Sequence, residues 1–448
     1  MKSRAFVWLV FFAYAVLIAI AVQTIILPRV LPSLHAGSGL MIGGDWLDYH
    51  TEASELARRV AAEGWSSWTL RPSKHAISGI LGALYVIAVP EPWVFIPVAA
   101  ALHATAGLAL ALVLLRFVRR FRLAVIGALP FVLFPTSLLW VTQPLKDGLS
   151  VCGFALFLLA WFVALDLART KRRYWTRAVL CISLLVSGLF LVWLARPYAM
   201  VLLWVLGAIA AAGISLVLAF RVWRRKTGGA AASRIVVVLL IAMIASGFLP
   251  KDSSRDGVWE ITADVQLEQS TGINEGVVWN RSRYVPRAID DVFQLLAQQR
   301  RGSSHYYNAG SNLDDETQFV RASDVIKYLP RATQIALFSP FPRMWFASGS
   351  GAESGLMRMA SAVEMAFTYL MVLPCVVCLW MRKRLPESWL LLLFCSVPLV
   401  MQALFVVNVG TIVRLRFPYL LPFVCLGWAC LLAYAPQAAR RMRTLVIR

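Results

Sequence analysis

One short stretch of this sequence, residues 43–52 with the order Gly-Gly-Asp-Trp-Leu-Asp-Tyr-His-Thr-Glu, brings several reactive side chains together. The carboxylates of Asp45 and Asp48 have the chemistry of a general base, and the side chains of Tyr49 and His50 can bind a substrate. The pattern after the two glycines predicts a helix that opens at Asp48. Helix capping and solvated charge would explain the same residues equally well, so the rest of the chain has to decide between the two interpretations.

Further polar residues stand in apolar surroundings later in the chain: Lys146, Asp147, Arg196, Tyr198, Arg414 and Arg416. Ionisable groups at membrane depth are costly, and they mark functional sites more often than not. Lysine and arginine can hold a phosphate at a membrane surface while a carboxylate acts as a base. This combination suits an enzyme with a lipid-linked phosphate donor. The alternative is that the arginines extend along apolar surface to lipid headgroups.

The composition indicates which class of protein positions these residues. Of the 448 residues, 59% are apolar and 15% are charged, whereas a soluble globular chain is about half apolar and about a quarter charged. Too few charges remain to cover the surfaces of soluble domains, and the apolar content excludes a disordered chain. The sequence therefore predicts an all-α polytopic membrane protein.

Apolar runs long enough to cross about 30 Å of hydrocarbon as helices define ten predicted spans. They are Ala5–Leu27, Val94–Leu115, Leu123–Val141, Leu149–Leu167, Ala178–Ala195, Ala199–Phe220, Arg234–Leu249, Ala360–Met381, Ser388–Val407 and Pro418–Ala435. A shorter run, Ala76–Val89, predicts an interfacial or re-entrant helix in the first external loop. The predicted fold is thus about ten transmembrane helices, with interfacial helices in that loop and a small external segment.

The positions of the charges predict an orientation in the membrane. The formal net charge is +21, and basic clusters follow every second predicted span, as at residues 116–122 and 169–177. By the positive-inside rule both termini are cytoplasmic, in a multi-pass protein of the bacterial inner membrane. The basic excess then faces anionic headgroups, so the predicted partners include membrane lipids and exclude nucleic acid.

The spans divide the chain into three predicted parts. Residues 1–249 form an N-terminal membrane module with seven spans and the first external loop, 28–93. Residues 250–347 form an external loop domain and an interfacial segment, in which residues 286–301 have a helical pattern. Residues 348–448 form a C-terminal membrane module with three spans. All seven cysteines lie within or at the edges of predicted spans, so no disulfide is expected.

Several of these residues resemble motifs of a known family. Asp45 and Tyr49 match the Asp-x-x-x-Tyr spacing in the first loop of GT-C glycosyltransferases, such as the protein-mannosylating and lipid A-aminoarabinose enzymes. Lys146-Asp147, after Pro-Thr-Ser at 135–137, resembles bacterial relatives with Lys-Asp at this place. Residues 338–342, Phe-Ser-Pro-Phe-Pro, and 410–416, Gly-Thr-x-x-Arg-x-Arg, look like features of polytopic proteins from exopolysaccharide loci.

The resemblance implies a function. In that family the first-loop Asp is the base toward an acceptor hydroxyl, and the donor is a polyprenyl-phosphate sugar, so Asp45 becomes the catalytic candidate. The family's usual acidic pair is Asp-Glu, whereas Trp46 follows Asp45 here, which makes Asp48 the alternative base. The implied partners are this lipid-linked donor and a glycan or lipid acceptor. A divalent metal ion is a possible cofactor.

Three classes of function fit the sequence. The first is a GT-C-like glycosyltransferase in cell-surface polysaccharide biosynthesis. The second is a polysaccharide polymerase or ligase that acts on polyprenyl-diphosphate-linked repeats, in which external Arg and His residues matter more than a carboxylate. The third is a glycolipid flippase or transporter, which should carry polar groups near the bilayer midplane and broken spans. The predicted spans contain few ionisable groups, with His103 the main exception, and this disfavours the third class.

Overall fold

The computed structural model describes residues 2–167, 174–224, 236–241, 243–244, 247, 278–306, 311–346 and 352–446. Within these residues the chain is almost entirely helical, with one two-stranded hairpin. Eight described helices are long and apolar enough to cross a membrane: Ser3–Val30, Pro92–Val118, Asp147–Asp166, Tyr174–Ala195, Pro197–Trp223, Gly355–Met381, Pro386–Phe405 and Val409–Tyr434. The predicted all-α polytopic membrane class is confirmed.

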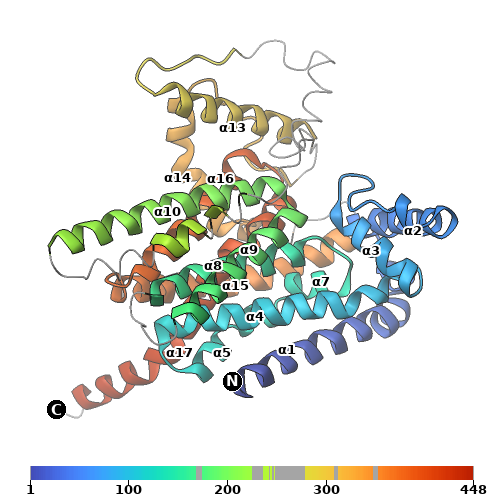
Figure 1. Cartoon of the computed structure of the whole chain (residues 1–448), viewed down its shortest axis with the longest axis horizontal. Coiled ribbons are helices and arrows are strands. Elements are labelled where there is room, and N and C mark those ends of the chain that lie inside the picture. Colours follow the sequence, from blue (N-terminus) through green and yellow to red (C-terminus); the bar gives the residue numbers. More distant parts are fainter. Residues whose placement is uncertain are drawn as a thin grey trace.

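The N-terminal spanning helices lie side by side in chain order (Figure 1). They are α1 (Lys2–Ala21, extended by a π-helix to Val30), α4 (Ile96–Val118), α8 (Asp147–Asp166), α9 (Tyr174–Ala195) and α10 (Pro197–Trp223). The closest approach is between α8 and α9, where a Cβ added at Gly153 would lie 2.6 Å from the Gly188 carbonyl oxygen. Glycine at this crossing lets the two backbones touch.

The C-terminal spanning helices complete the core. They are α15 (Ala352–Met381), α16 (Pro386–Phe405) and α17 (Val409–Val446), and α17 packs against α4 and α8 as well as α15 and α16. Phe157, Trp161 and Phe394 are fully buried where α8 meets α16. The start of α1 and the end of α17 lie at the opposite end of the bundle from the helices of the first loop (Figure 1). The division into three domains stays a prediction.

The third predicted span is not one straight helix. It consists of α5 (Phe121–Gly127), α6 (Leu129–Leu133) and α7 (Pro135–Thr142), with a bend of 66° between the part that ends at Leu133 and α7. Pro135 begins α7 and has no N–H to continue the helix before it, which accounts for the break. The structure therefore has eight such spans, or nine with this bent pair, among the described residues.

The structure describes the seventh predicted span only in part, and it begins the last one earlier than predicted. Most of the seventh predicted span, Arg234–Leu249, lies outside the described residues, although residues 236–241 are helical. The last spanning helix begins at Val409 and not at Pro418. The sequence analysis placed Arg414 and Arg416 before the helix because charges are costly in a span. The structure pairs Arg414 with Asp45 and Asp147 and gives Arg416 backbone acceptors, so the helix can start earlier.

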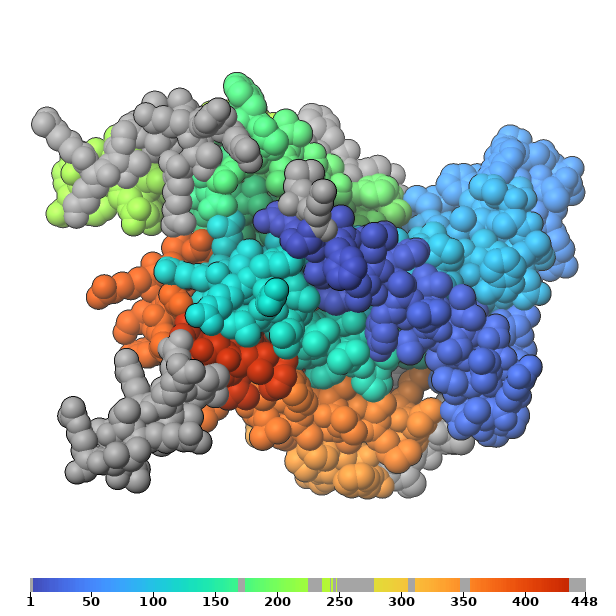
Figure 2. Space-filling model, turned by 90° about the horizontal axis from the view of Figure 1, so that it is seen from below, coloured from blue at the N-terminus to red at the C-terminus, as the bar shows by residue number. Residues whose placement is uncertain are grey.

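The first loop forms a lobe at one end of the molecule (Figure 2). It contains strands β1 (His35–Gly37) and β2 (Leu40–Met41), then α2 (Asp45–Glu63) and α3 (Ala76–Ile87), which pack together. The short helix expected at 76–89 is present, but α2 begins at Asp45 and not at Asp48. Gly44 precedes it because a Cβ there would lie 2.3 Å from the Trp46 ring.

A second irregular region lies before α15. Its helices are α13 (Arg287–Tyr306), which agrees with the predicted run at 286–301, and α14 (Ala322–Phe338). A cis Ser339–Pro340 peptide bond and a 3-10 turn, Pro342–Met344, follow. Residues 248–277 lie outside the described part of the chain.

A disulfide joins Cys378 of α15 to Cys430 of α17, contrary to the expectation of none. Their Cα atoms are 6.2 Å apart because the two helices pack against each other. The sequence analysis expected none because the cysteines lie in spans, whereas this bond joins two spanning helices to each other. The other five cysteines are free and buried.

Candidate functional site

A cluster of four charged side chains lies between the first loop and the helix bundle. One amino group of Arg414, Nη2, donates hydrogen bonds to Asp45 Oδ2 at 2.9 Å and to Asp147 Oδ2 at 3.0 Å. Arg196 Nη2 pairs with the other oxygen of Asp147, and Arg196 Nη1 lies 3.5 Å from Ser150 Oγ. The cluster therefore joins residues that are up to 369 positions apart in the sequence.

Each member of this cluster stands at the end of a helix or close to one. Asp45 and Asp147 are the first residues of α2 and α8, where helix N–H groups favour a carboxylate. Arg196 lies in the tight connection between α9 and α10, just before Pro197. Arg414 lies in the second turn of α17. Helix ends thus bring two aspartates and two arginines to one edge of the bundle.

The exposure of these side chains differs in a way that separates their roles. The Asp147 side chain is 0% exposed and that of Arg196 is 7% exposed, so this pair is closed to a substrate. The side chains of Arg414 and Asp45 are 35% and 45% exposed. A buried ion pair needs its partner, because removing one charge leaves the other uncompensated. Asp147 and Arg196 therefore fix Arg414 from the buried side of the cluster, while the side chains of Asp45 and Arg414 are partly exposed to solvent.

Lys146 and His75 form the neighbouring part of the site. The Lys146 ammonium donates to His75 Nδ1 at 3.2 Å, and the ring of Tyr49 lies edge-on to His75 at 5.1 Å between centroids. Burial, followed by the positive charge of Lys146, lowers the pKa of His75 to about 4. Burial and then the charge of Asp45 raise the pKa of the Tyr49 phenol. Both rings are therefore neutral at ordinary pH, and Lys146 is the cation.

A hydrogen-bond network fixes the turn that carries Lys146 and Asp147. Buried Gln143 accepts from the Met41 backbone N–H at 3.1 Å and donates to the Gly39 carbonyl at 3.2 Å. Gln23 donates to the Thr142 carbonyl at 2.6 Å. The β-hairpin, α1 and the end of α7 are thereby held together next to the charged cluster.

The remaining predicted site residues lie elsewhere. Asp48 is exposed and has no hydrogen bond or ion pair within the described chain. His50 Nδ1 lies 2.7 Å from the Tyr85 hydroxyl, which ties α2 to α3, and Tyr198 is half-buried near Arg196. Arg416 is buried and donates to the carbonyls of Ile335 and Ala336 at the end of α14. The structure thus brings together Asp45, Tyr49, Lys146, Asp147, Arg196 and Arg414.

Sequence reasoning missed three residues with clear roles. His75 could have been noticed, since Lys74-His75 directly precedes the short apolar helix. Gln143 carries no charge and lies in no motif, so nothing in the local sequence marked it. Glu364 was overlooked within the eighth predicted span, although it is a carboxylate in an apolar helix. It accepts hydrogen bonds from the Thr136 N–H and hydroxyl at 2.6 and 2.7 Å, and so caps α7 at the break in the third span.

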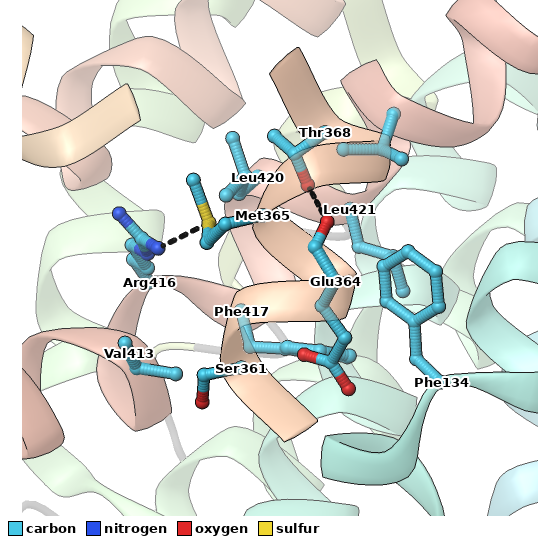
Figure 3. Close-up of a pocket in the computed structure, with 11 residues that line it drawn as sticks. Phe134, Ser361, Glu364, Met365, Thr368, Val413, Arg416, Phe417, Leu420 and Leu421 are labelled. Atoms are coloured by element: carbon cyan, nitrogen blue, oxygen red, sulfur yellow. Dashed lines mark hydrogen bonds between the residues drawn. The ribbon is translucent and has the colours of Figure 1, made fainter. Parts of the chain in front are cut away.

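A pocket lies beside Glu364, between α15 and α17 (Figure 3). Glu364 and Arg416 are its charged lining residues, and the other walls are mostly apolar, including Phe134 and Leu421. Arg416 points to Met365 in this view. The charges of Asp45 and Asp147 are not part of the lining.

The described residues contain no group of three or more His, Cys, Asp or Glu side chains arranged to hold a metal ion. At the charged cluster, the positive charge between Asp45 and Asp147 comes from Arg414.

The chain was compared with known proteins. No family model matches it, and no curated protein matches it. Among solved structures, the chain is similar to the archaeal oligosaccharyltransferase AglB from Archaeoglobus fulgidus, solved in complex with an inhibitory peptide and a dolichol-phosphate. The similarity covers 98% of this chain and 52% of that chain, with 13% identical residues and a TM-score of 0.47. The chain thus spans about half the length of that protein.

Proposed function

We propose that this protein is a membrane glycosyltransferase that moves a sugar from a polyprenyl-phosphate donor to a glycan or lipid acceptor. The observation that carries this proposal is the placement of Arg414, a half-buried guanidinium held between two carboxylates at the edge of the helix bundle. Lys146 lies next to Asp147 in the chain and supplies a second cation. A base and two phosphate-binding cations at a membrane edge match the needs of transfer from a lipid phosphate.

The hydrogen bonds of Arg414 support a role at the phosphate. Both of its contacts with carboxylates use Nη2. Its Nε and Nη1 donate to nothing in the described chain, so their N–H groups are available to an anion. Asp147 and Arg196 fix the guanidinium in place, so the site is preorganised for an anion.

The proposed reaction uses Asp45 as the base. Asp45 takes the proton of the acceptor hydroxyl, the hydroxyl oxygen bonds to the anomeric carbon, and the bond from that carbon to the phosphate oxygen breaks. The polyprenyl phosphate leaves with one more negative charge, which Arg414 and Lys146 stabilise. Asp45 fits this role better than Asp48, because it lies beside Arg414 whereas Asp48 points to no other charged group in the described chain.

The setting we propose is the outer face of a bacterial inner membrane, in cell-surface polysaccharide biosynthesis, with both termini cytoplasmic. The basic clusters that follow every second span support this orientation. The charged cluster and the first-loop lobe would then lie on the outer side, where a lipid-linked donor meets its acceptor.

A transfer assay tests the proposal. Purified protein in lipid vesicles is given a radiolabelled polyprenyl-phosphate sugar and membrane glycolipid extract, and the label in the acceptor fraction is followed. We expect transfer by the wild type and a raised KM for the donor in Arg414→Lys, which keeps the charge but loses the planar set of N–H donors. Arg120→Lys is the matched control, because Arg120 is exposed and lies between α4 and α5. Equal donor KM in all three proteins would remove Arg414 from the site.

A transporter is the second candidate, and one observation favours it. The third span is broken, and buried Glu364 sits at the break, as expected of a protein that binds cargo within the membrane. The same vesicles distinguish the two functions. A transporter would move labelled lipid between leaflets without changing it, whereas a transferase would produce a new labelled glycolipid.

A further inference from the structure

The segment around α13 and α14 contacts the short turn between α16 and α17, residues 404–409. Leu313 N–H donates to the Val407 carbonyl at 2.9 Å, and Val409 N–H donates to the Ser311 carbonyl at 3.3 Å. The Val407 N–H donates to Ser303 Oγ at 3.2 Å. The backbone groups of this turn are therefore satisfied largely by Ser303 and residues 311–313, which we call the clamp segment.

Arg300 anchors the clamp segment. Its side chain is almost fully buried and donates to the carbonyls of Leu404 at 3.1 Å, Thr317 at 3.0 Å and Asp314 at 2.5 Å. Buried guanidinium groups persist when several acceptors satisfy them. One side chain therefore holds the end of α16 against two points around the clamp segment.

Asn408 links the clamp segment to α17 with both ends of its amide. Its Oδ1 accepts from the Thr411 N–H at 3.1 Å, which caps the first turn of α17. Its Nδ2 donates to Ser311 Oγ at 3.2 Å and lies 3.5 Å from Asn312 Oδ1. The side-chain amide accepts at one end and donates at the other.

A second attachment holds α17 about two turns further along. Arg416 is buried and donates to the carbonyls of Ile335 and Ala336 and to Ser339 Oγ, at the end of α14. Arg414 lies between the two attachments. Since residues two apart on a helix point about 200° apart, Arg416 faces α14 while Arg414 faces Asp45 and Asp147.

We propose that the clamp segment sets the position and rotation of the first two turns of α17, and that Asn408 is thereby a positioning residue for Arg414. The segment that contains α13 and α14 thus positions a charged residue of the cluster, although none of the four charged side chains of the cluster comes from this segment. A group that moves this segment, such as a bound acceptor, would change the fit between Arg414 and Asp45.

Two variants break the link by different routes. Asn408→Asp keeps an oxygen to cap α17 but cannot donate to Ser311 and Asn312. The double variant Ser311→Ala/Asn312→Ala leaves Asn408 unchanged and removes both acceptors, so it covers the case in which the buried carboxylate prevents folding. Arg281→Ala is the matched control, because Arg281 pairs with Asp291 on an exposed surface of the same segment.

Hydrogen exchange measures the position of α17 directly. We expect amides of residues 409–416 to exchange about ten-fold faster in both variants, and not in Arg281→Ala. The decisive measurement is amide exchange in α2. Residues 47–52 should also lose protection, because Arg414 restrains Asp45. A merely local weakening of the turn would leave α2 unchanged. Unchanged exchange at 409–416, or a change there without one at 47–52, would overturn the proposal.

The transfer assay adds a functional readout. We expect kcat/KM to fall about ten-fold or more in both variants, since a misplacement of about 1 Å can cost about 100-fold. Wild-type kcat/KM in variants whose α17 exchanges faster would overturn the positioning role. Because the place of Arg414 at the donor is itself part of the proposed function, this assay depends on that function, whereas hydrogen exchange does not. A wild type without transfer activity would reject the proposed function and leave the exchange data to decide on the clamp.

Discussion

Asp45 and Asp48 are three residues apart on one helix, yet their surroundings differ completely. Asp45 lies against Arg414 and near Asp147, whereas Asp48 points to solvent. General-base assistance is worth about 10²- to 10⁴-fold. We therefore expect Asp45→Asn to lose transfer by a factor in this range, and Asp48→Asn to stay near wild type. Initial rates at matched protein level in vesicles check this, and the reverse order would move the base to Asp48.

We expect the stability of the folded chain to depend on pH through His75. Its pKa is lowered to about 4 in the folded chain, against about 6.5 when unfolded. Between these values the unfolded chain binds a proton that the folded chain does not, so stability falls as the pH drops from about 6.5 to about 4. We expect Tm to decline across this window in wild type and less steeply in His75→Gln. Parallel curves from thermal unfolding in detergent would show that His75 does not contribute.

The sequence showed which charged residues to consider for the site, but it did not show which residues they contact. Local sequence identified Asp45, Lys146, Asp147, Arg196 and Arg414, because charges stand out in apolar sequence. It could not show that Arg416 faces α14, since helix rotation depends on tertiary packing. His75 was missed for a related reason: its importance comes from Lys146, which is 71 residues away.

Among the elements, the break between α6 and α7 depends on a residue far away in the chain. Glu364 satisfies the first N–H and the hydroxyl of Thr136 at the start of α7. Loss of such a cap costs about 1 kcal/mol. Glu364→Ala should therefore lower Tm by a few degrees, while Glu364→Gln, which keeps an acceptor for the N–H, should lower it less. Thermal unfolding of both variants in the same detergent measures this, and equal Tm values for wild type and Glu364→Ala would contradict the capping role.

The elements show what hydropathy can and cannot predict. It located most of the spanning helices well, since length and apolar content suffice for that. It did not predict the bend at Pro135, because prolines are also tolerated in straight spans. It also began α17 too late, because the cost of Arg414 in a helix is offset by Asp45 and Asp147, which come from other elements.

For the whole molecule, the orientation in the membrane is open to direct measurement. The free cysteines in the described chain are all buried, so the labelling background is low. Cysteines at exposed Ser66 and Tyr284 should react with an impermeant thiol reagent added outside intact cells, and one at exposed Arg120 should not. Ser303 is unsuitable for this test because it is buried against Val407. Labelling of Arg120→Cys alone would invert the orientation and place the charged cluster inside the cell.

The hydrogen bond between Arg414 and Asp45 joins residues 369 positions apart, the first loop and the last described helix. A ribosome that adds about 5–20 residues per second needs roughly 20–75 s to make the chain between them. During that interval the nascent protein carries Asp45 on the membrane without its guanidinium partner. Chains released before Val409 would contain the carboxylate but no Arg414, and we expect them to be inert in the vesicle assay. The charged cluster can thus form only after Arg414 has been synthesised, and under the proposed function translation products that end before it cannot consume a lipid donor.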